Sequence, residues 1–345
     1  MTVSLPAIAQ QLDAIDRIVF DDPSAALRLC KTALQSARSE RDVESLVRAA
    51  TLLSLIEDQL GERSEGSVVL AEALACCQMY GLAHLEPAVQ ERLGRDNYTG
   101  GDYRLAMRHW AHSVRQCGSH PMHCRTRALA LIGLGHVCSA YGALGRASEF
   151  HQLADKVLTP LGDVYLIAKV RISLGWDLCA LGRHEEAQPI LNEALALCKE
   201  QNFNHYQAEL LLRLAEIETT HGNLEAAEQL LEESLAILVF TPSHWCEANV
   251  LKHLAQLRAR QGALDMAMNL ALRALHITEA DGMRHVEALI HADLAGYAAA
   301  AGQQVLAEQH RARHEQVNRS LDQGLQGGPA PDLSSLDDLL AIPVA

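Results

Sequence analysis

Apolar residues recur along most of the chain with the three- and four-residue spacing of one face of an α-helix. The same phrase also returns every forty residues, as "LGRHEEAQPILNEAL" (181–195), "HGNLEAAEQLLEESL" (221–235) and "QGALDMAMNLALRAL" (261–275). No segment shows a convincing alternation typical of a β-strand. The pattern therefore predicts an all-α protein built from an internal repeat of helices.

A glycine in each repeat marks the predicted turn between two antiparallel helices. Glycine adopts the left-handed backbone conformation that commonly ends a helix. Successive markers are 40 or 41 residues apart, and an aspartate takes the place of glycine in the first repeat. The eight anchors are Asp21, Gly61, Gly101, Gly142, Gly182, Gly222, Gly262 and Gly302.

Small residues accompany each anchor at fixed distances. In the third repeat, Gly94 lies seven residues before the anchor Gly101, Ala106 lies five residues after it, and the larger Trp110 follows four residues later. These offsets place the residues on helical stripes where a neighbouring helix approaches closely. Neither helix of a pair buries its stripe alone, so the pairs are expected to stack.

The segment "RLGRDNYTGGDYRLAMRHWAHSV" resembles the tetratricopeptide repeat (TPR) family, through its Leu-Gly pair, its turn glycine and its small–aromatic–small second helix. The resemblance covers residues 7–318, and the period of forty is longer than the usual thirty-four. It implies a right-handed α-solenoid of about eight helix-turn-helix units over residues 1–320. Residues 321–345 are then a linker and a short acidic amphipathic tail.

The resemblance also implies a concave wall lined by the first helix of each pair. Cations and aromatic residues are more frequent at the implied wall positions than in the whole chain, which predicts a groove for an acidic or amphipathic peptide or helix. The alternative is a set of ordinary solvated side chains. The paired asparagines of the chaperone-binding TPR proteins are missing. The ten candidate binding residues on this wall are Arg92, Arg95, His136, Lys169, Trp176, Arg213, Asn249, Lys252, His253 and Gln256, and the acidic Glu216 lies on the wall beside them.

The end of the chain has a separate pattern. "GGPAP" (327–331) is typical of a linker, and "DLSSLDDLLAIPVA" places Leu333, Leu336, Leu339 and Leu340 at helical spacing among acidic residues. An acidic amphipathic segment on a tether is typical of a helix-in-groove ligand. It is expected to dock on the chain's own groove, on a second copy or on another protein; the alternative is a disordered end with a short helix.

Composition narrows the classes of function. The 345 residues are 49% hydrophobic but only 4% aromatic, and 43 acidic residues outnumber 29 Lys and Arg for a formal charge of −14. This balance argues against nucleic acid and anionic membranes as partners. We see no signal peptide, no membrane span and a set of cysteines within helical stripes, which together predict a cytoplasmic protein. The long repeat resembles the variants found in bacterial sensor and regulator arrays, which implies a bacterial-type protein.

Candidate chemistry is sparse. Cys117, His120, His123 and Cys124 offer donors that suit zinc or copper, but adjacent His and Cys are poorly placed as ligands and Pro121 restricts the turn. No phosphate loop, nucleophile elbow or zinc-protease motif is found. We therefore expect neither an enzyme nor a cofactor, but a scaffold, adaptor or regulator. The alternatives are a sensor that binds a small molecule or signal peptide inside the superhelix, and a metal-binding protein using residues 117–124.

Overall fold

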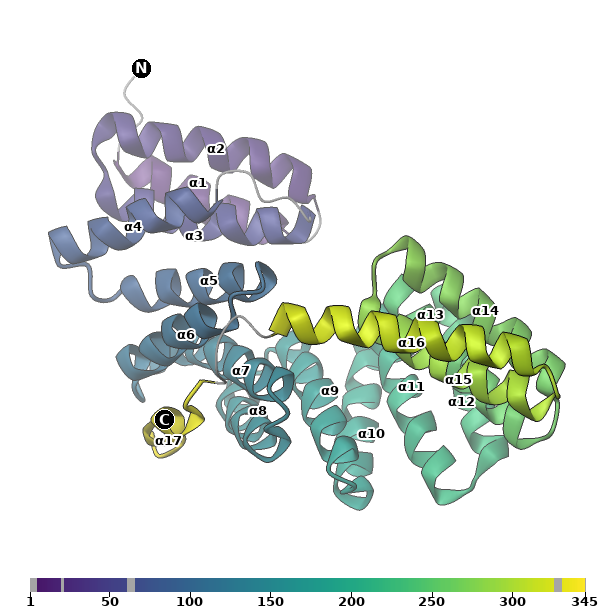
Figure 1. The fold of residues 1–345 in the computed structure, drawn as a ribbon. Coiled ribbons are helices and arrows are strands. Elements are labelled where there is room, and N and C mark those ends of the chain that lie inside the picture. Colours follow the sequence, from purple (N-terminus) through teal and green to yellow (C-terminus); the bar gives the residue numbers. More distant parts are fainter. Residues whose placement is uncertain (1–4, 20–21, 61–65, 326–330, 345) are drawn as a thin grey trace. The chain divides into compact units, whose positions relative to one another are not determined.

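The computed structural model of the chain describes residues 5–19, 22–60, 66–325 and 331–344 (Figure 1). Within these ranges every regular element is a helix, which confirms the predicted all-α repeat solenoid. None of these helices is both long and apolar enough to cross a bilayer. The chain divides into two compact units, Met1–Leu161 with Asp332–Ala345 and Gly162–Pro331, and each unit is described by itself below.

The first unit stacks four antiparallel helix pairs in chain order and ends with the tail. The partners of each pair pack against one another, and the first helices α1, α3, α5 and α7 also contact each other in succession. Its elements are α1 (Leu5–Ile18), α2 (Pro23–Glu40), α3 (Val43–Leu60), α4 (Gly66–Tyr80), α5 (Glu86–Thr99), α6 (Tyr103–Cys117), η1 (Pro121–His123), α7 (Cys124–Ala140), α8 (Leu144–Leu158), η2 (Thr159–Leu161), η3 (Leu333–Leu336) and α17 (Asp337–Leu340).

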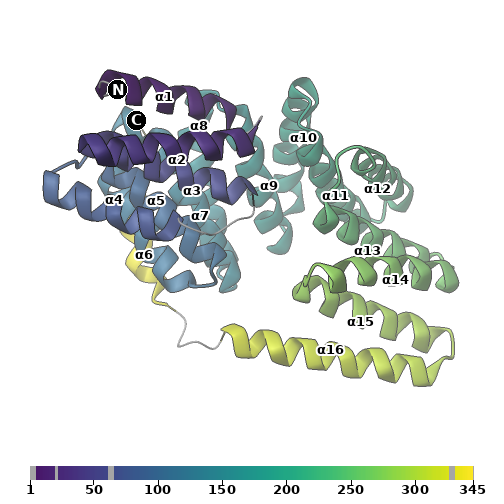
Figure 2. The same cartoon turned by 90° about the horizontal axis from the view of Figure 1, so that it is seen from above.

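The second unit stacks four further pairs in the same way (Figure 2). The first helices α9, α11, α13 and α15 again contact each other and form a continuous layer, with α10, α12, α14 and α16 packed on it. The elements are α9 (Val164–Ala180), α10 (His184–Gln201), α11 (Asn204–His221), α12 (Leu224–Leu238), α13 (His244–Arg260), α14 (Leu264–Ala280), α15 (Arg284–Ala300) and α16 (Gln304–Leu325).

The anchor glycines form the turns inside the pairs. Six of them have a left-handed backbone with φ between 73° and 87°, a conformation that glycine adopts without steric cost. The side chain of Asp102 then caps α6 by accepting a hydrogen bond of 2.9 Å from the amide of Leu105. The anchors Asp21 and Gly61 lie outside the described residues. The six are Gly101, Gly142, Gly182, Gly222, Gly262 and Gly302.

A second series of left-handed residues, which we did not predict, lies between successive pairs. Gly81, Gly162 and Gly282 belong to it, with φ of 64° to 70°. At equivalent places Arg41 (φ 57°) and Asn202 (φ 59°) adopt the same conformation with a side chain. Five junctions between successive pairs therefore contain a left-handed residue, whereas the junction from α12 to α13 does not.

The small residues permit close helix packing, as the spacing predicted. Trp110 on α6 is 1% exposed, and its Nε1 donates a 3.0 Å hydrogen bond to the carbonyl of Glu91. A Cβ added at Gly94 on α5 would lie 2.5 Å from the Trp110 ring, and one added at Gly133 on α7 would lie 2.4 Å from it. The indole is thus enclosed by the backbones of two helices, where a methyl group does not fit.

Two other glycines also allow a large side chain to pack directly on helix backbone. A Cβ at Gly135 would lie 2.3 Å from His151 on α8, and a Cβ at Gly175 on α9 would lie 2.4 Å from Leu191 on α10. Both partners are buried, at 1% and 0% exposure. Helix pairs in both units are therefore held together by a large side chain that contacts bare backbone.

Candidate functional site

All ten predicted wall residues lie on first helices of the pairs. Three are in the first unit, on α5 and α7, and seven are in the second, on α9, α11 and α13. The first helices form the contacting layer of each unit, so the residues share one layer within their own unit. Their side chains differ in how much surface they leave for a ligand.

In the first unit the two arginines of α5 bind the neighbouring first helix α3. Arg92 donates from Nε to Ser54 Oγ at 3.1 Å and from Nη2 to the carbonyl of Ser54 at 2.9 Å. Arg95 Nε lies 3.2 Å from Asp58 Oδ2. The ring of His136 on α7 lies 6.0 Å from that of Tyr98 and 5.2 Å from that of His151. These contacts hold helices together, and Arg92 is mostly covered as a result.

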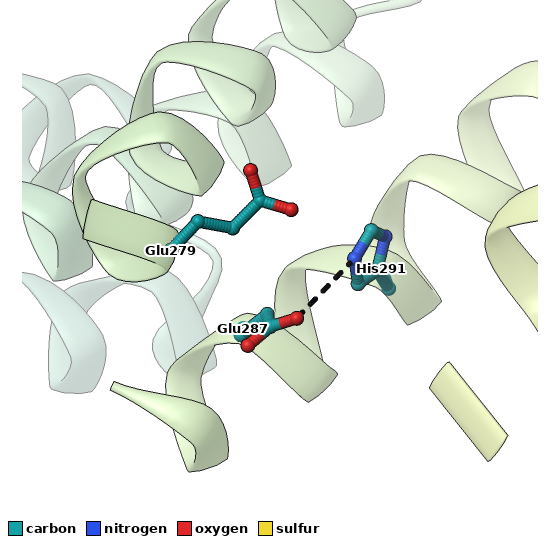
Figure 3. Close-up of side chains that lie close together, drawn as sticks. All are labelled: Glu279, Glu287 and His291. Carbon is teal, nitrogen blue, oxygen red and sulfur yellow. Dashed lines mark ion pairs between the residues drawn. The ribbon is translucent and has the colours of Figure 1, made fainter. Parts of the chain in front are cut away.

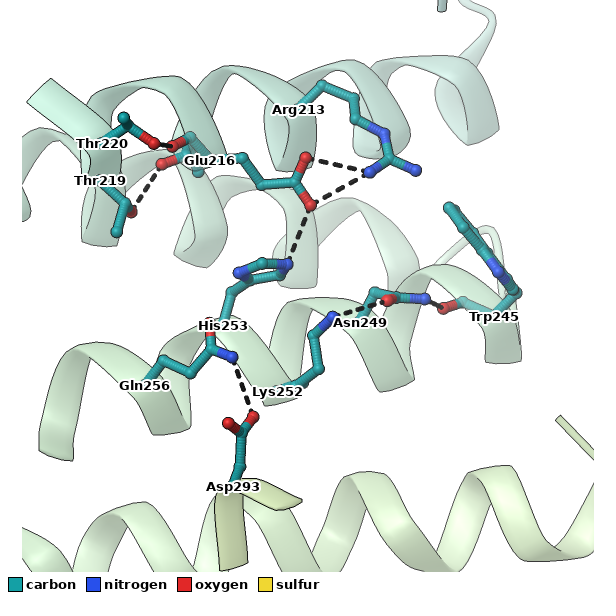
Figure 4. A network of polar contacts seen from close by, with 11 residues as sticks. Arg213, Glu216, Thr219, Thr220, Trp245, Asn249, Lys252, His253, Gln256 and Asp293 are labelled. Atoms are coloured by element: carbon teal, nitrogen blue, oxygen red, sulfur yellow. Dashed lines mark hydrogen bonds and ion pairs between the residues drawn. The ribbon is translucent and has the colours of Figure 1, made fainter. Parts of the chain in front are cut away.

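In the second unit the predicted residues of α11 and α13 come together in one polar network (Figure 4). Arg213 Nη1 donates to both carboxylate oxygens of Glu216, at 3.1 and 3.0 Å. His253 Nε2 lies 2.9 Å from Glu216 Oε1. The Arg213 guanidinium also lies over the ring of Trp245, with its Cζ 5.4 Å from the ring centroid, which adds a cation–π attraction.

The same network continues along α13 towards α15. Asn249 donates to the carbonyl of Trp245 at 2.8 Å and accepts from Lys252 Nζ at 3.4 Å. Gln256 Nε2 donates to Asp293 Oδ2 on α15 at 2.9 Å. Asn249 and Lys252 are each only 8% exposed, whereas Trp245 remains 37% exposed. The aromatic ring is therefore the largest part of this network that a ligand can reach.

Burial and charge compete within the network. Burial raises the pKa of Glu216, but Arg213 and His253 outweigh burial and lower that pKa to about 2. Burial raises the pKa of Glu209, which lies near Arg213 and Lys169. Burial also lowers the pKa of Lys252. The cations that the sequence predicted for the wall are thus accompanied by carboxylates from the same helices, which makes this region less positive than predicted.

Trp245, Glu209 and Asp293 were not among the predicted residues, although their helical or repeat spacing from predicted residues indicated them. Trp245 lies four residues before Asn249, so both share one stripe of α13. Glu209 lies four residues before Arg213, and Asp293 lies forty residues after His253, one period of the repeat. On α9, the predicted Trp176 is 37% exposed and Lys169 is partly buried.

The four metal-donor candidates in the loop after α6 are not brought together. Cys117 is buried in the core at 2% exposure, and burial raises the pKa of its thiol to about 11. His120 uses Nδ1 to accept a hydrogen bond from the amide of Met122, and the rings of His120 and His123 are 5.6 Å apart. A thiol held protonated in a core is a poor metal ligand. Among the described residues, a group of three possible metal donors lies elsewhere, in the second unit.

That cluster joins Glu279 on α14 to Glu287 and His291 on α15 (Figure 3). Glu287 and His291 are 1% and 4% exposed, and Glu287 Oε1 lies 3.9 Å from His291 Nε2. Glu287 is also paired with Arg284 at 3.0 Å and with Arg313 on α16 at 3.4 Å. Two guanidinium groups already neutralise this carboxylate and would repel a cation, so the cluster is explained as a structural ion-pair network.

His291 is the most strongly perturbed histidine of the network. Its Nδ1 lies 2.9 Å from Nδ1 of His310 on α16. Burial lowers the pKa of His291 to about 4, and the neighbouring charges of His310, Arg313 and His314 add to the effect. The imidazole is therefore neutral at pH 7 and links α15 to α16.

Sequence comparison identifies part of the repeat directly. A sequence model of the tetratricopeptide repeat matches residues 166–238, which span α9 to α12. This stretch of the chain therefore matches the tetratricopeptide repeat, which is the family that the anchor glycines and small residues predicted. Comparison with curated proteins finds no match.

Solved structures share the fold at low sequence identity. A Rap protein complexed with competence and sporulation factor has a TM-score of 0.62 at 13% identity, with 92% of this chain and 99% of that chain covered. Aspartyl phosphate phosphatase F from Bacillus subtilis gives 0.55 at 12% identity, covering 92% and 95%. A signal transduction ATPase with a TPR sensor from Pyrococcus horikoshii gives 0.56 at 15%, covering 82% of this chain and 41% of that one.

Proposed function

We propose that the protein is a non-catalytic interaction module, a scaffold, adaptor or regulator, and that the first-helix layer of the second unit binds a peptide or helix of a partner. The observation that carries this proposal is the Arg213–Trp245 pair. A tryptophan that is 37% exposed has its ring held beneath a guanidinium. Aromatic and arginine side chains of this kind dominate the binding energy of protein interfaces.

The chemistry of the neighbouring residues indicates the kind of ligand. Asn249, Lys252 and Gln256 place amide and ammonium groups along one stripe of α13. Asn249 and Lys252 are each 8% exposed and all three side chains have partners in the network, so a ligand uses these groups only by replacing those partners. Such donors bind carbonyl and carboxylate oxygens, while the exposed face of Trp245 suits an apolar side chain. A partner segment with both features, acidic and amphipathic, fits this surface best.

The test uses short random peptides displayed as a library and selected on the full-length protein. Selected peptides are expected to be acidic and amphipathic, and Trp245→Ala is expected to weaken them about tenfold or more. Arg183→Gln is the matched control for Arg213→Gln, since Arg183 makes the same i,i+3 pair with Glu186 on α10. Circular dichroism checks the fold. Equal binding by the Trp245 and Arg213 variants and the wild type would place the site elsewhere.

A second candidate is a sensor that changes shape when it binds a small molecule or signal peptide. Two of the similar structures favour it, one solved with competence and sporulation factor and one described as a TPR sensor. The sensor and the adaptor differ in whether binding a peptide changes the shape of the protein. A sensor should show a changed radius of gyration in small-angle X-ray scattering when a selected peptide saturates it, whereas an adaptor should show none.

A further inference from the structure

The C-terminal tail is a folded part of the first unit. Asp332 begins it, and its side chain accepts hydrogen bonds from the amide and the hydroxyl of Ser334, at 3.0 and 2.6 Å. η3 and α17 follow as two short helical turns that contact α6 and α8. Leu336 and Leu339 are 1% and 0% exposed, so two of the four predicted tail leucines are fully buried.

Three arginines from three helices hold this segment. Arg115 on α6 binds Asp338 through two hydrogen bonds, Nε to Oδ2 at 2.8 Å and Nη2 to Oδ1 at 3.0 Å, and also donates to the carbonyl of Ser335 at 2.9 Å. Arg146 on α8 donates to the carbonyl of Leu333 at 2.6 Å and pairs with Asp337. These contacts combine charge pairing with recognition of the main chain.

Arg127 on α7 completes the set. It is 2% exposed, and its two terminal nitrogens donate to the carbonyls of Ile342 and Pro343, each at 2.7 Å. A buried guanidinium needs acceptors for its hydrogen bonds, and these two tail carbonyls supply them. None of Arg115, Arg127 and Arg146 is a predicted wall residue. The tail therefore occupies a surface that is different from the predicted groove.

We propose that this surface, the arginine seat formed by Arg115, Arg127 and Arg146, is an exchangeable peptide-binding site. Its own tail is the resident occupant, and the incoming occupant is a partner segment of the same chemistry. Such a segment has two leucines three residues apart with two acidic residues between them, as in Leu336-Asp337-Asp338-Leu339. Arg127 donates only to main-chain carbonyls of the tail, and Arg115 and Arg146 each donate to one such carbonyl as well. Any segment with this pattern can accept these hydrogen bonds.

The resident tail sets the condition for exchange. A tethered ligand has an effective concentration that reaches the millimolar range for short flexible linkers, so a free peptide binds weakly while the tail is seated. Most of the tail's ion pairs are exposed, with Arg115 and Asp338 at 45% and 56%, and such pairs hold a segment only modestly. A partner in a local complex can therefore replace the tail, and the proposal stands independently of the proposed wall in the second unit.

The experiment uses the full-length chain with Leu336→Asp and Leu339→Asp, which should unseat its own tail. A fluorescent peptide of residues 331–345 with natural sequence is the probe, measured by anisotropy. The unseated chain is expected to bind this peptide at least about tenfold more tightly than the wild type does. Absence of binding to the unseated chain, with helicity intact, overturns the proposal.

A charge exchange tests the seat itself. Arg115→Glu in the unseated chain should weaken the natural peptide about tenfold, and a peptide with Asp338→Arg should recover much of that loss. If neither Arg115→Glu in the chain nor Asp338→Arg in the peptide alters the affinity, the peptide does not bind at the arginine seat. A fluorophore at the C-terminus of the otherwise wild-type chain gives a second measurement, since excess unlabelled peptide should release the tail and lower the anisotropy. A constant anisotropy there means that the tail does not exchange.

Discussion

Replacing Gly133 by alanine tests whether bare backbone around Trp110 is essential for the stacking of the first unit. The new Cβ would lie 2.4 Å from Cδ2 of the indole, whereas carbon atoms prefer a separation of roughly 3.5–4.0 Å. The ring must move by about 1 Å, but the α5 backbone at Gly94 also packs so closely on the ring that a Cβ added there would lie 2.5 Å from it. We therefore expect real overpacking rather than a small adjustment.

The magnitude follows from two opposing contributions. Alanine in a helix interior is favoured over glycine by up to about 1 kcal/mol. Overpacking of a filled core costs roughly 1–3 kcal/mol, and the Nε1 hydrogen bond to Glu91 is strained as the ring moves. The Gly133→Ala variant should therefore lose roughly 1–2 kcal/mol of unfolding free energy, measured by urea denaturation followed by circular dichroism.

The control is Gly145→Ala, in the first turn of α8 of the same unit, where an added Cβ meets nothing within 4 Å. It should leave stability unchanged or raise it by a few tenths of a kcal/mol. Combining Gly133→Ala with Trp110→Leu should cost less than the sum of the two single changes, by about 1 kcal/mol or more. If Gly133→Ala is as stable as the control, the packing argument is refuted.

Three further predictions concern turns and buried charge. Arg41→Gly should stabilise the first unit by roughly 0.5–1 kcal/mol, because glycine adopts the left-handed backbone there without strain. Gly81→Ala should destabilise it, because alanine is strained at φ +70°. Urea denaturation in which both variants change the free energy of unfolding in the same direction would contradict this. The pKa of His291 is about 4 in the folded state and 6.5 in the unfolded state, so the free energy of unfolding is retained above pH 6.5 and falls by up to about 3 kcal/mol as the pH falls to 4. A His291→Asn variant should flatten this pH dependence. If the variant keeps the pH profile of the wild type, His291 is not its cause. Glu287→Gln should lower stability by roughly 1–3 kcal/mol, whereas Glu279→Gln, at an exposed position, should have almost no effect on the thermal midpoint.

The sequence predicted the helix pairs because each pair repeats the same local constraints. A turn glycine and a small residue at fixed distances, such as Gly101 and Ala106, are required by helix geometry alone and recur seven or eight times. The second series of turns was missed because two of its members, Arg41 and Asn202, are not glycines. Both residues are left-handed C-caps, of α2 and α10, and without a glycine the sequence carries no signal for such a cap.

The candidate site was predicted only in part, for a related reason. Periodicity placed Arg213, Glu216 and His253 on the first-helix layer, but it did not show that the Glu216 carboxylate binds both of the other side chains. The tail shows the same limit. Its leucines could be read from spacing, whereas its seat depends on Arg115, Arg127 and Arg146, which are far away in sequence and come together only in the folded unit.

The contact of Gly175 with Leu191, and that of Gly135 with His151, makes each pair of positions mutually dependent in evolution. A glycine can become alanine only after its partner has become smaller, and a smaller partner leaves a void until the glycine has changed. Among natural variants of this chain the two positions should therefore change together or not at all. Such coupled substitutions would record the helix contacts in sequences whose structures have never been determined.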